Sequence, residues 1–301
     1  MATANPTTYP LAGPQVSGDK ITVSTLLAQP TRITRYLSDL SLRGFVSSRI
    51  FSTASGVSGG AVIYDQLTLN DLFPTRDVQN VGPGAEFPIV TSENQEPKVA
   101  AVEKFGGKFF VTDEAKTRND TGVIQREGVK LINAITRKID ARAIATLDAE
   151  IAARAATQSM TGTNWSAVVT AGASQSNASA WPAADFAKAQ LLADQQELGV
   201  TFNLWLLNPQ QLAQLKLVYG SDYSAVLSSY GIEAVASNRI TAGTAYVLVA
   251  GAVGELRLEK PLTTETWREE SRQITWVQSD VRPVMYVTDP YSVVKVTGLA
   301  G

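Results

Sequence analysis

The fold is decided by residues 84–156, which begin with GAEFPIVTSENQEPKVAAVEKFGGKFFVT (84–112) and continue with DEAKTRNDTGVIQREGVKLINAITRKIDARAIATLDAEIAARAA (113–156). In the first part, the strand-like runs 86–91 and 98–112 flank a polar turn and predict a long hairpin. An isolated two-stranded hairpin is marginal in water. We therefore expect this hairpin to lie on another surface, and a second copy of the chain is a natural candidate.

The second part predicts one long amphipathic helix over residues 121–156. It starts at Asn119, Asp120 and Thr121, a cluster of residues that favour a helix N-terminus. Apolar residues then recur at near-helical spacing, and no proline interrupts the run. At ~1.5 Å per residue, such a helix is a rod of roughly 55 Å. A rod of this length indicates a structural spine and favours a shell subunit over an enzyme built around a pocket.

The composition excludes several classes of site. The chain has 301 residues, of which 44% are hydrophobic and 18% charged, and its net charge is −2. No strong overall field is therefore expected to attract nucleic acid or a membrane. The absence of cysteine and histidine excludes disulfides, thiolate and imidazole metal sites, and Ser–His–Asp or Cys–His catalysis. We expect no cofactor and no metal.

Enzyme activity is the least favoured interpretation of the sequence. A hydrolase would need convergent carboxylates or a Ser–Lys pair, and the only match is Ser17–Lys20 within an extended segment. The longest apolar run, 245–253, is too short to span a membrane, and the first residues lack the pattern of a signal peptide. We expect a soluble protein made in the cytoplasm and no enzyme.

The remaining elements follow from periodicity, proline and glycine. Residues 1–22 are expected to form an extended arm. Gly106-Gly107 is expected to form a bulge or bend in the predicted strand 98–112. Helices are expected at 30–40, 182–198 and 209–218. Strands are expected at 45–51, 61–67, 203–207, 240–250, 255–258, 266–278, 282–287 and 293–296.

Charge is unevenly distributed along the chain. Residues 1–50 contain five basic and two acidic residues, whereas residues 62–112 contain four basic and seven acidic ones. The two segments could pair between copies, although solvated faces explain the same pattern. Trp267 and Trp276 are either interface anchors or core residues. The resulting candidates for contacts between subunits are Arg32, Arg35, Arg43, Arg76, Asp77, Glu86, Glu93, Glu96, Trp267 and Trp276.

The ordered set of local segments resembles a known family, the major capsid proteins of tailed bacteriophages with the Hong Kong ninety-seven phage fold. Those of actinobacterial siphophages are the most similar. The similarity covers nearly the whole chain and rests on the order of the segments, because no single motif is diagnostic. The segments are GGAVIYD (59–65), PGAEFPIV (83–90), KFGGKFFVTDE (104–114), the predicted spine helix, TWREESRQITWVQ (266–278) and DPYSVVKVT (289–297).

The resemblance implies an α+β phage major capsid fold. Residues 1–61 are expected to form an N-terminal arm, and residues 62–112 an extended loop that lies across a neighbouring subunit. A peripheral domain with the spine helix and long strands would comprise 113–160 and 250–285. A mixed α/β axial domain at the centre of pentamers and hexamers would comprise 161–249 and 286–301.

The function implied by the resemblance is structural. The chain would assemble as hexamers and pentamers into an icosahedral shell, part of the virion, built in the bacterial host cytoplasm around double-stranded DNA without sequence specificity. Further partners would be a portal, a possible decoration protein and a scaffolding protein. No long charged helical segment precedes the arm, so the scaffold would be a separate protein unless a propeptide is removed. An encapsulin, a bacterial compartment built on the same fold, is the alternative.

One departure from the family gives a testable prediction. The family's type member seals its shell with an isopeptide bond between a lysine of the extended loop and an asparagine near the C-terminus. Here no lysine occurs in residues 63–97, and the last asparagine is Asn238. We therefore expect boiling in detergent to release single chains from mature shells. A ladder of covalent multimers on the gel would contradict this.

Overall fold

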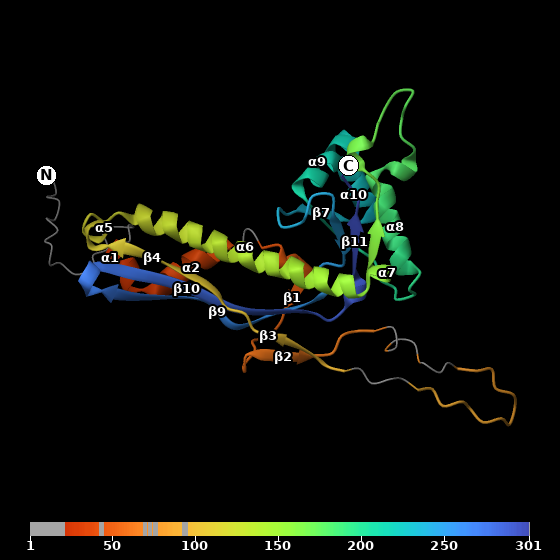
Figure 1. Ribbon diagram of the computed structural model, residues 1–301, viewed down its shortest axis with the longest axis horizontal. Coiled ribbons are helices and arrows are strands. Elements are labelled where there is room, and N and C mark those ends of the chain that lie inside the picture. Colours follow the sequence, from red (N-terminus) through yellow and green to blue (C-terminus); the bar gives the residue numbers. More distant parts are fainter. Residues whose placement is uncertain are drawn as a thin grey trace, which may run out of the picture. The chain divides into compact units, whose positions relative to one another are not determined.

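The computed structural model describes residues 22–41, 45–68, 71, 74, 78–91 and 96–300, apart from the side chains of residues 40 and 41. These residues form two compact units (Figure 1). The first unit contains the described residues up to Phe45 together with Glu103–Ile139 and Leu258–Pro283. The second contains the described residues of Val46–Val102 together with Asp140–Arg257 and the residues from Val284 onward. Helices and strands are mixed throughout, as an α+β fold requires.

A layer of helices forms one side of the first unit. It consists of α1 (Val23–Ala28), α2 (Pro30–Ser41), α5 (Asp113–Thr117) and residues 121–139 of α6 (Thr121–Ala153), the long yellow-green helix of Figure 1. The inward-facing side chains share one apolar core with the sheet below. From the helices this core includes Val23, Leu27, Ile33, Leu37, Ile124 and Ile132.

Long strands form the other layer of the first unit. β4 (Phe105–Thr112) pairs antiparallel with residues 274–281 of β10 (Ile274–Val287), which is hydrogen-bonded on its other side to β9 (Gly254–Glu269). Because side chains alternate along a strand, Phe109, Val111 and Val277 point into the core. The intervening residues of the same strands face away from the helices.

A five-stranded sheet is the centre of the second unit, in the order β5-β11-β8-β6-β7. The pairs β5–β11 and β6–β7 are parallel, whereas β8 runs antiparallel to β11 and β6. Both faces of the sheet are covered, which explains why β6 and β8 are apolar at every position. The strands are β5 (Ser159–Thr161), β6 (Leu204–Leu207), β7 (Glu233–Ala236), β8 (Ala245–Leu248) and β11 (Val293–Thr297).

Two apolar cores lie on opposite faces of this sheet. On one face Leu204 and Leu206 pack with Ile144 and Leu147 of α6, and on the other Trp205 packs with α8 and α9. The surrounding helices are α3 (Ser47–Ile50), α7 (Ala155–Gln158), α8 (Pro182–Asp194), α9 (Pro209–Tyr219) and α10 (Tyr223–Tyr230). The remaining strands of this unit are β1 (Phe51–Thr53), which pairs with the start of β9, β2 (Ala61–Tyr64) and β3 (Lys98–Ala101).

The predicted hairpin of 86–91 with 98–112 is wrong. Residues 86–91 form no strand, and the second run divides into β3, which pairs antiparallel with β2, and β4, which pairs with β10. Pro88 interrupts the first run because proline has no N–H to donate to a ladder. Ala61–Tyr64 instead supplies a pairing strand of matching length.

Two smaller expectations are also corrected. The predicted strand 45–51 is mostly α3, because the Asp140 carboxylate accepts the N–H groups of Val46 and Ser47 at 3.1 and 3.0 Å and caps that turn. Gly106-Gly107 forms no bulge, since the register of β4 with β10 is unbroken. Glycine is needed there for close packing: a Cβ at Gly106 would lie 2.8 Å from both the Asp280 Cβ and the Ser279 oxygen.

The tightest glycine gives a prediction for stability. A Cβ at Gly254 would lie 2.1 Å from the Tyr286 carbonyl oxygen, which belongs to the backbone and cannot rotate away. We expect Gly254→Ala to lower the free energy of unfolding by about 2 kcal/mol or more, measured by urea denaturation. Gly82→Ala is the control, because nothing lies within 4 Å of its Cβ position. Equal stability of the two variants would contradict the packing described.

Candidate functional site: an anchored loop and an aromatic face

The segment that joins β2 to β3, residues 65–97, is here called the long loop. Its described central part, residues 78–91, has no helix or strand (Figure 1). Large apolar side chains in it are exposed, with Phe87 80% and Ile89 72% accessible. Val78 is exposed as well, and so are Ile63 and Val99 on the two strands at its base. These exposed apolar groups make the segment a candidate interaction surface.

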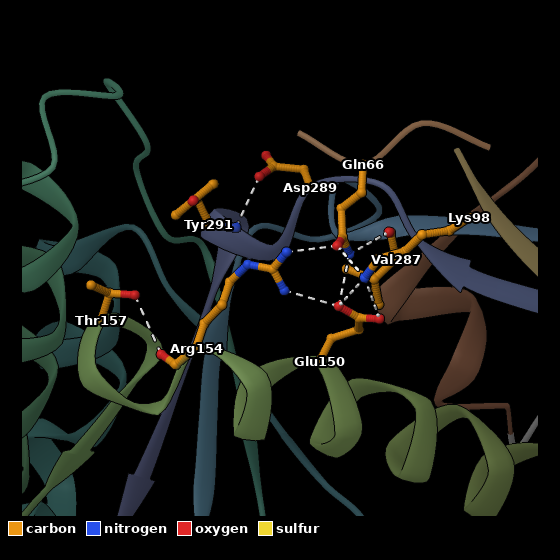
Figure 2. Close-up of polar contacts among 8 residues, drawn as sticks. All are labelled: Gln66, Lys98, Glu150, Arg154, Thr157, Val287, Asp289 and Tyr291. Carbon is orange, nitrogen blue, oxygen red and sulfur yellow. Dashed lines mark hydrogen bonds and ion pairs between the residues drawn. The ribbon is translucent and has the colours of Figure 1, made fainter. Parts of the chain in front are cut away.

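A buried glutamine anchors the base of the long loop. Gln66 is 4% exposed, and its side-chain amide makes four hydrogen bonds. Its Oε1 accepts from Lys98 Nζ and from Arg154 Nη2, each at 2.6 Å, and its Nε2 donates to Glu150 Oε2 at 2.9 Å and to the Val287 carbonyl at 3.0 Å (Figure 2). The amide of Gln66 thereby ties both ends of the loop to α6 and β10.

Glu150 is the anionic centre of this anchor. Arg154, one helical turn along, approaches its Oε2 at 2.9 Å, and Lys98 Nζ lies 3.2 Å from its Oε1 (Figure 2). Burial alone would raise the pKa of this carboxyl, but hydrogen bonds from Gln66, Arg154 and Lys98 together lower it below its usual value. Glu150 is therefore ionised at neutral pH, as an ion-pair centre must be.

Aromatic stacking and a backbone bond support the anchor. The rings of Tyr64 and Tyr286 stack with centroids 4.6 Å apart, and the Leu67 N–H donates to the Thr288 carbonyl at 2.8 Å. The Tyr286 hydroxyl donates to Glu255. Burial and that carboxylate raise the pKa of Tyr286 to about 12, so the hydroxyl remains a donor at neutral pH. The loop base is held by specific polar contacts, even though most of residues 78–91 are exposed.

An aromatic row lies on the sheet face of the first unit that points away from the helices. Trp276 lies opposite Phe110, and its ring contacts both Phe110, at a centroid distance of 5.6 Å, and Trp267, at 6.3 Å. Lys108 Nζ lies 4.3 Å from the Trp276 ring centroid, a cation–π distance. The indole Nε1–H of Trp276 donates to Glu269 at 2.7 Å.

The exposure of these side chains shows whether the two tryptophans lie in an apolar core or at the surface. Trp267 is 40% and Phe110 50% exposed, while Trp276 is partly buried. Neither tryptophan belongs to an apolar core, in contrast to the fully buried Trp205. Both are therefore placed where a partner could contact them, which keeps them as candidates for interface anchors.

The charged candidates fall into two groups. Arg32 and Arg35 lie exposed on α2, and Glu86 and Glu96 lie exposed in the long loop. The others lie outside the described residues: Arg43, Arg76, Asp77 and Glu93. Ser17 and Lys20, the Ser–Lys pair considered for a hydrolase, also lie outside them.

Buried carboxylates in the second unit have structural partners. Asp185 accepts the Trp165 indole N–H at 2.8 Å and the Thr163 N–H at 2.9 Å, which holds the segment after β5 against α8. Asp140 caps α3, and burial raises its pKa. Among the residues that the structure describes, no group of three or more acidic side chains is placed to hold a metal ion. No helix in that part of the chain is long and apolar enough to cross a membrane.

The anchor residues were missed by the sequence analysis. Gln66 and Glu150 are 84 positions apart, and Arg154 is one of several charged residues within the predicted helix 121–156. A glutamine directly after an apolar strand gives no signal of burial, since glutamine is usually exposed.

The anchor predicts a local effect of mutation. Gln66→Ala removes four hydrogen bonds and leaves Lys98 and Arg154 to share Glu150 alone. We expect amide hydrogen exchange of residues 61–64 and 98–101 to accelerate at least tenfold, because pairing of two short strands is weak without support. Gln210→Ala, at an exposed helical position, is the control. Unchanged exchange in both strands would show that Gln66 does not anchor the loop.

Comparison with known proteins gives the family and the fold. A model of the family described as phage capsid protein matches residues 95–296. The chain is similar to a structure from Mycobacterium phage Adephagia, with 14% identity over 84% of this chain and 90% of that chain and a TM-score of 0.60. It is similar to the capsid structure of the cyanophage P-SCSP1u, with 13% identity, 86% and 89% coverage and a TM-score of 0.57.

A third similar structure is a virus-like particle from Pyrococcus furiosus, with 12% identity over 88% of this chain and 98% of that chain and a TM-score of 0.56. At such identities the likeness concerns the fold. No curated protein matches the sequence. The family model, however, spans well over half of the residues. The chain therefore belongs to the phage capsid protein family.

Proposed function

We propose that this protein is the major capsid protein of a tailed bacteriophage, which self-assembles as hexamers and pentamers into an icosahedral shell around double-stranded DNA. Membership of the phage capsid family supports a structural protein of a virion shell. The observation that carries the finer proposal is the long loop, which exposes Phe87 and Ile89 on a segment whose base is firmly anchored. Such a segment is built to bury its apolar side chains on another copy.

The same proposal assigns a structural role to each part of the chain. Residues 1–61 act as the arm, 62–112 as the extended loop, 113–160 with 250–285 as the peripheral domain, and 161–249 with 286–301 as the axial domain. Many weak contacts of this kind add up through closed symmetry. No catalytic role is proposed, and assembly takes place in the host cytoplasm with a separate scaffolding protein, a portal and, at the outer surface, a decoration protein.

Charge and aromatic groups offer specific contacts between copies. The exposed Arg32 and Arg35 of α2 could meet Glu86 and Glu96 of a neighbour's long loop, each pair being weak and sensitive to salt. Trp267 and Trp276 offer flat apolar surface to a neighbouring subunit. Arg43, Arg76, Asp77 and Glu93 are proposed for the same role from their sequence positions alone.

A second candidate is an encapsulin-type compartment shell. The observation in its favour is the likeness to the virus-like particle from Pyrococcus furiosus, which covers 98% of that chain. Electron microscopy of purified assemblies separates the two. Phage-sized heads that form with a scaffolding protein support the capsid, whereas small cages of uniform size that contain protein cargo support the compartment.

The loop contact is tested by substitution. We expect Phe87→Ser/Ile89→Ser to abolish shells in electron micrographs and to leave the far-ultraviolet circular dichroism unchanged, because both side chains are exposed within the single chain. The conservative variant Phe87→Leu/Ile89→Val keeps the apolar area and should assemble. Normal shells from the serine variant would contradict a role of the loop in assembly. An unfolded serine variant would show that the two side chains support their own chain.

A further inference from the structure

The charges of the first unit are arranged differently on its two layers. On the strands, every cation that the structure describes within residues 258–283 has an acidic partner. Arg268 meets Asp113 at 2.7 Å, and Arg282 meets Glu259 at 3.3 Å. Likewise, Lys260 meets Asp280 at 2.9 Å, and Arg272 meets Glu269 at 3.3 Å. These four cations are thereby balanced by carboxylates of the same unit.

The helix layer is not balanced. Arg126, Arg137 and Lys138 of α6 are exposed, and none of them forms an ion pair with another residue that the structure describes. Lys130 is the exception, since its Nζ lies 2.7 Å from Glu127, but this exposed i,i+3 pair is weak. Glu127 is also the one acidic residue in 121–139. The outward side of this helix segment therefore carries four cations and one carboxylate.

These cations are placed regularly along the helix. Arg126, Lys130 and Arg137 recur at i, i+4 and i+11, which keeps them on one face, and Lys138 flanks it. At ~1.5 Å per residue they extend over about 17 Å. Gln125 and Asn133, also exposed, add side-chain amide donors. We name the set Arg126, Lys130, Arg137 and Lys138 the basic helix face.

α2 adds positive charge to the same layer. Leu37 of α2 lies against Gly128 of α6, where a Cβ would come within 3.1 Å of the Leu37 Cδ2. The exposed Arg32 and Arg35 of α2 likewise form no ion pair with a described residue of this unit. Arginine suits phosphate well, because its guanidinium donates two parallel hydrogen bonds.

We propose that the basic helix face binds the phosphate backbone of duplex DNA. This inference rests on the proposed function, in which DNA is the content of the shell, and it names the surface that contacts it. Duplex DNA carries one phosphate charge per about 1.7 Å of axis, so a 17 Å row of cations meets several phosphates at once. The arginine and lysine side chains of this face contact phosphates and not base edges, so binding does not depend on the DNA sequence.

The acidic long loop of a second copy fits the basic helix face less well. Its described carboxylates, Asp65, Asp71, Glu86 and Glu96, lie at least six positions apart, and exposed apolar residues lie near Glu86. Such a segment would neutralise one or two of the four cations. A continuous polyanion neutralises all of them, and the released counterions drive the binding.

The test compares two triple variants of the full chain. Arg126→Gln/Arg137→Gln/Lys138→Gln neutralises the helix face, and Arg268→Gln/Arg272→Gln/Arg282→Gln removes the same charge from the sheet layer. Binding of a short labelled duplex is measured by fluorescence anisotropy over a range of salt, at subunit concentrations where no shells form. We expect the helix variant to lose at least tenfold in affinity and about three units in the slope of log K against log salt. The sheet variant should bind nearly as the wild type does.

Each other outcome of the binding measurement overturns the proposal. Equal loss in both variants would show attraction by net charge alone, and no loss, or no binding by the wild type, would show that the face does not bind DNA. If the helix variant binds DNA normally but fails to form shells, the partner is the acidic surface of another copy. Absence of shells from the wild type would instead contradict the proposed function, and leaves the DNA measurement valid on its own.

Discussion

The structure depends on one constraint, which is that the described central part of the long loop, residues 78–91, leaves large apolar side chains exposed. Phe87, Ile89 and Val78 lie in a segment without strands, and the two short strands at its base could not stabilise it alone. Within the chain, the contacts of Gln66 and Glu150 and the stacked tyrosines hold the base of the loop. The large apolar side chains of residues 78–91 stay exposed in the single chain. Only a second molecule could bury them, as expected for a shell subunit.

Each of the two units is built around apolar cores of its own. In the second unit, both faces of the five-stranded sheet are covered, and α6 contributes a row of isoleucine and leucine side chains to one of the two cores. In the first unit, helices and long strands share one core. The charges differ between the layers: the cations within residues 258–283 have acidic partners, whereas Arg126, Arg137 and Lys138 of α6 form no ion pair with a described residue. A net charge of −2 therefore conceals a local basic surface.

Strong local signals allowed much of the fold to be predicted from the sequence. The long helix from Thr121, the helix that starts at Pro182 and the Asn208-capped α9 are confirmed, because caps, prolines and apolar spacing act within a few residues. The wrong predictions concern long-range partners. Lys98–Ala101 pairs with Ala61–Tyr64 and not with residues 86–91. Residues 47–50 are helical because Asp140, which is 93 positions away from Ser47, accepts the Ser47 N–H at the start of this turn. The anchor was missed for the same reason: burial of Gln66 is set by residues far along the chain.

The central claim is that the apolar side chains of the long loop become buried only when copies assemble. Hydroxyl-radical footprinting of Phe87 and Ile89, read by mass spectrometry before and after shell formation, tests it most directly. The account predicts fast oxidation of both side chains in free subunits and strong protection in shells, with the already buried Trp205 protected in both states. Equal oxidation of Phe87 and Ile89 in free subunits and in shells would contradict it.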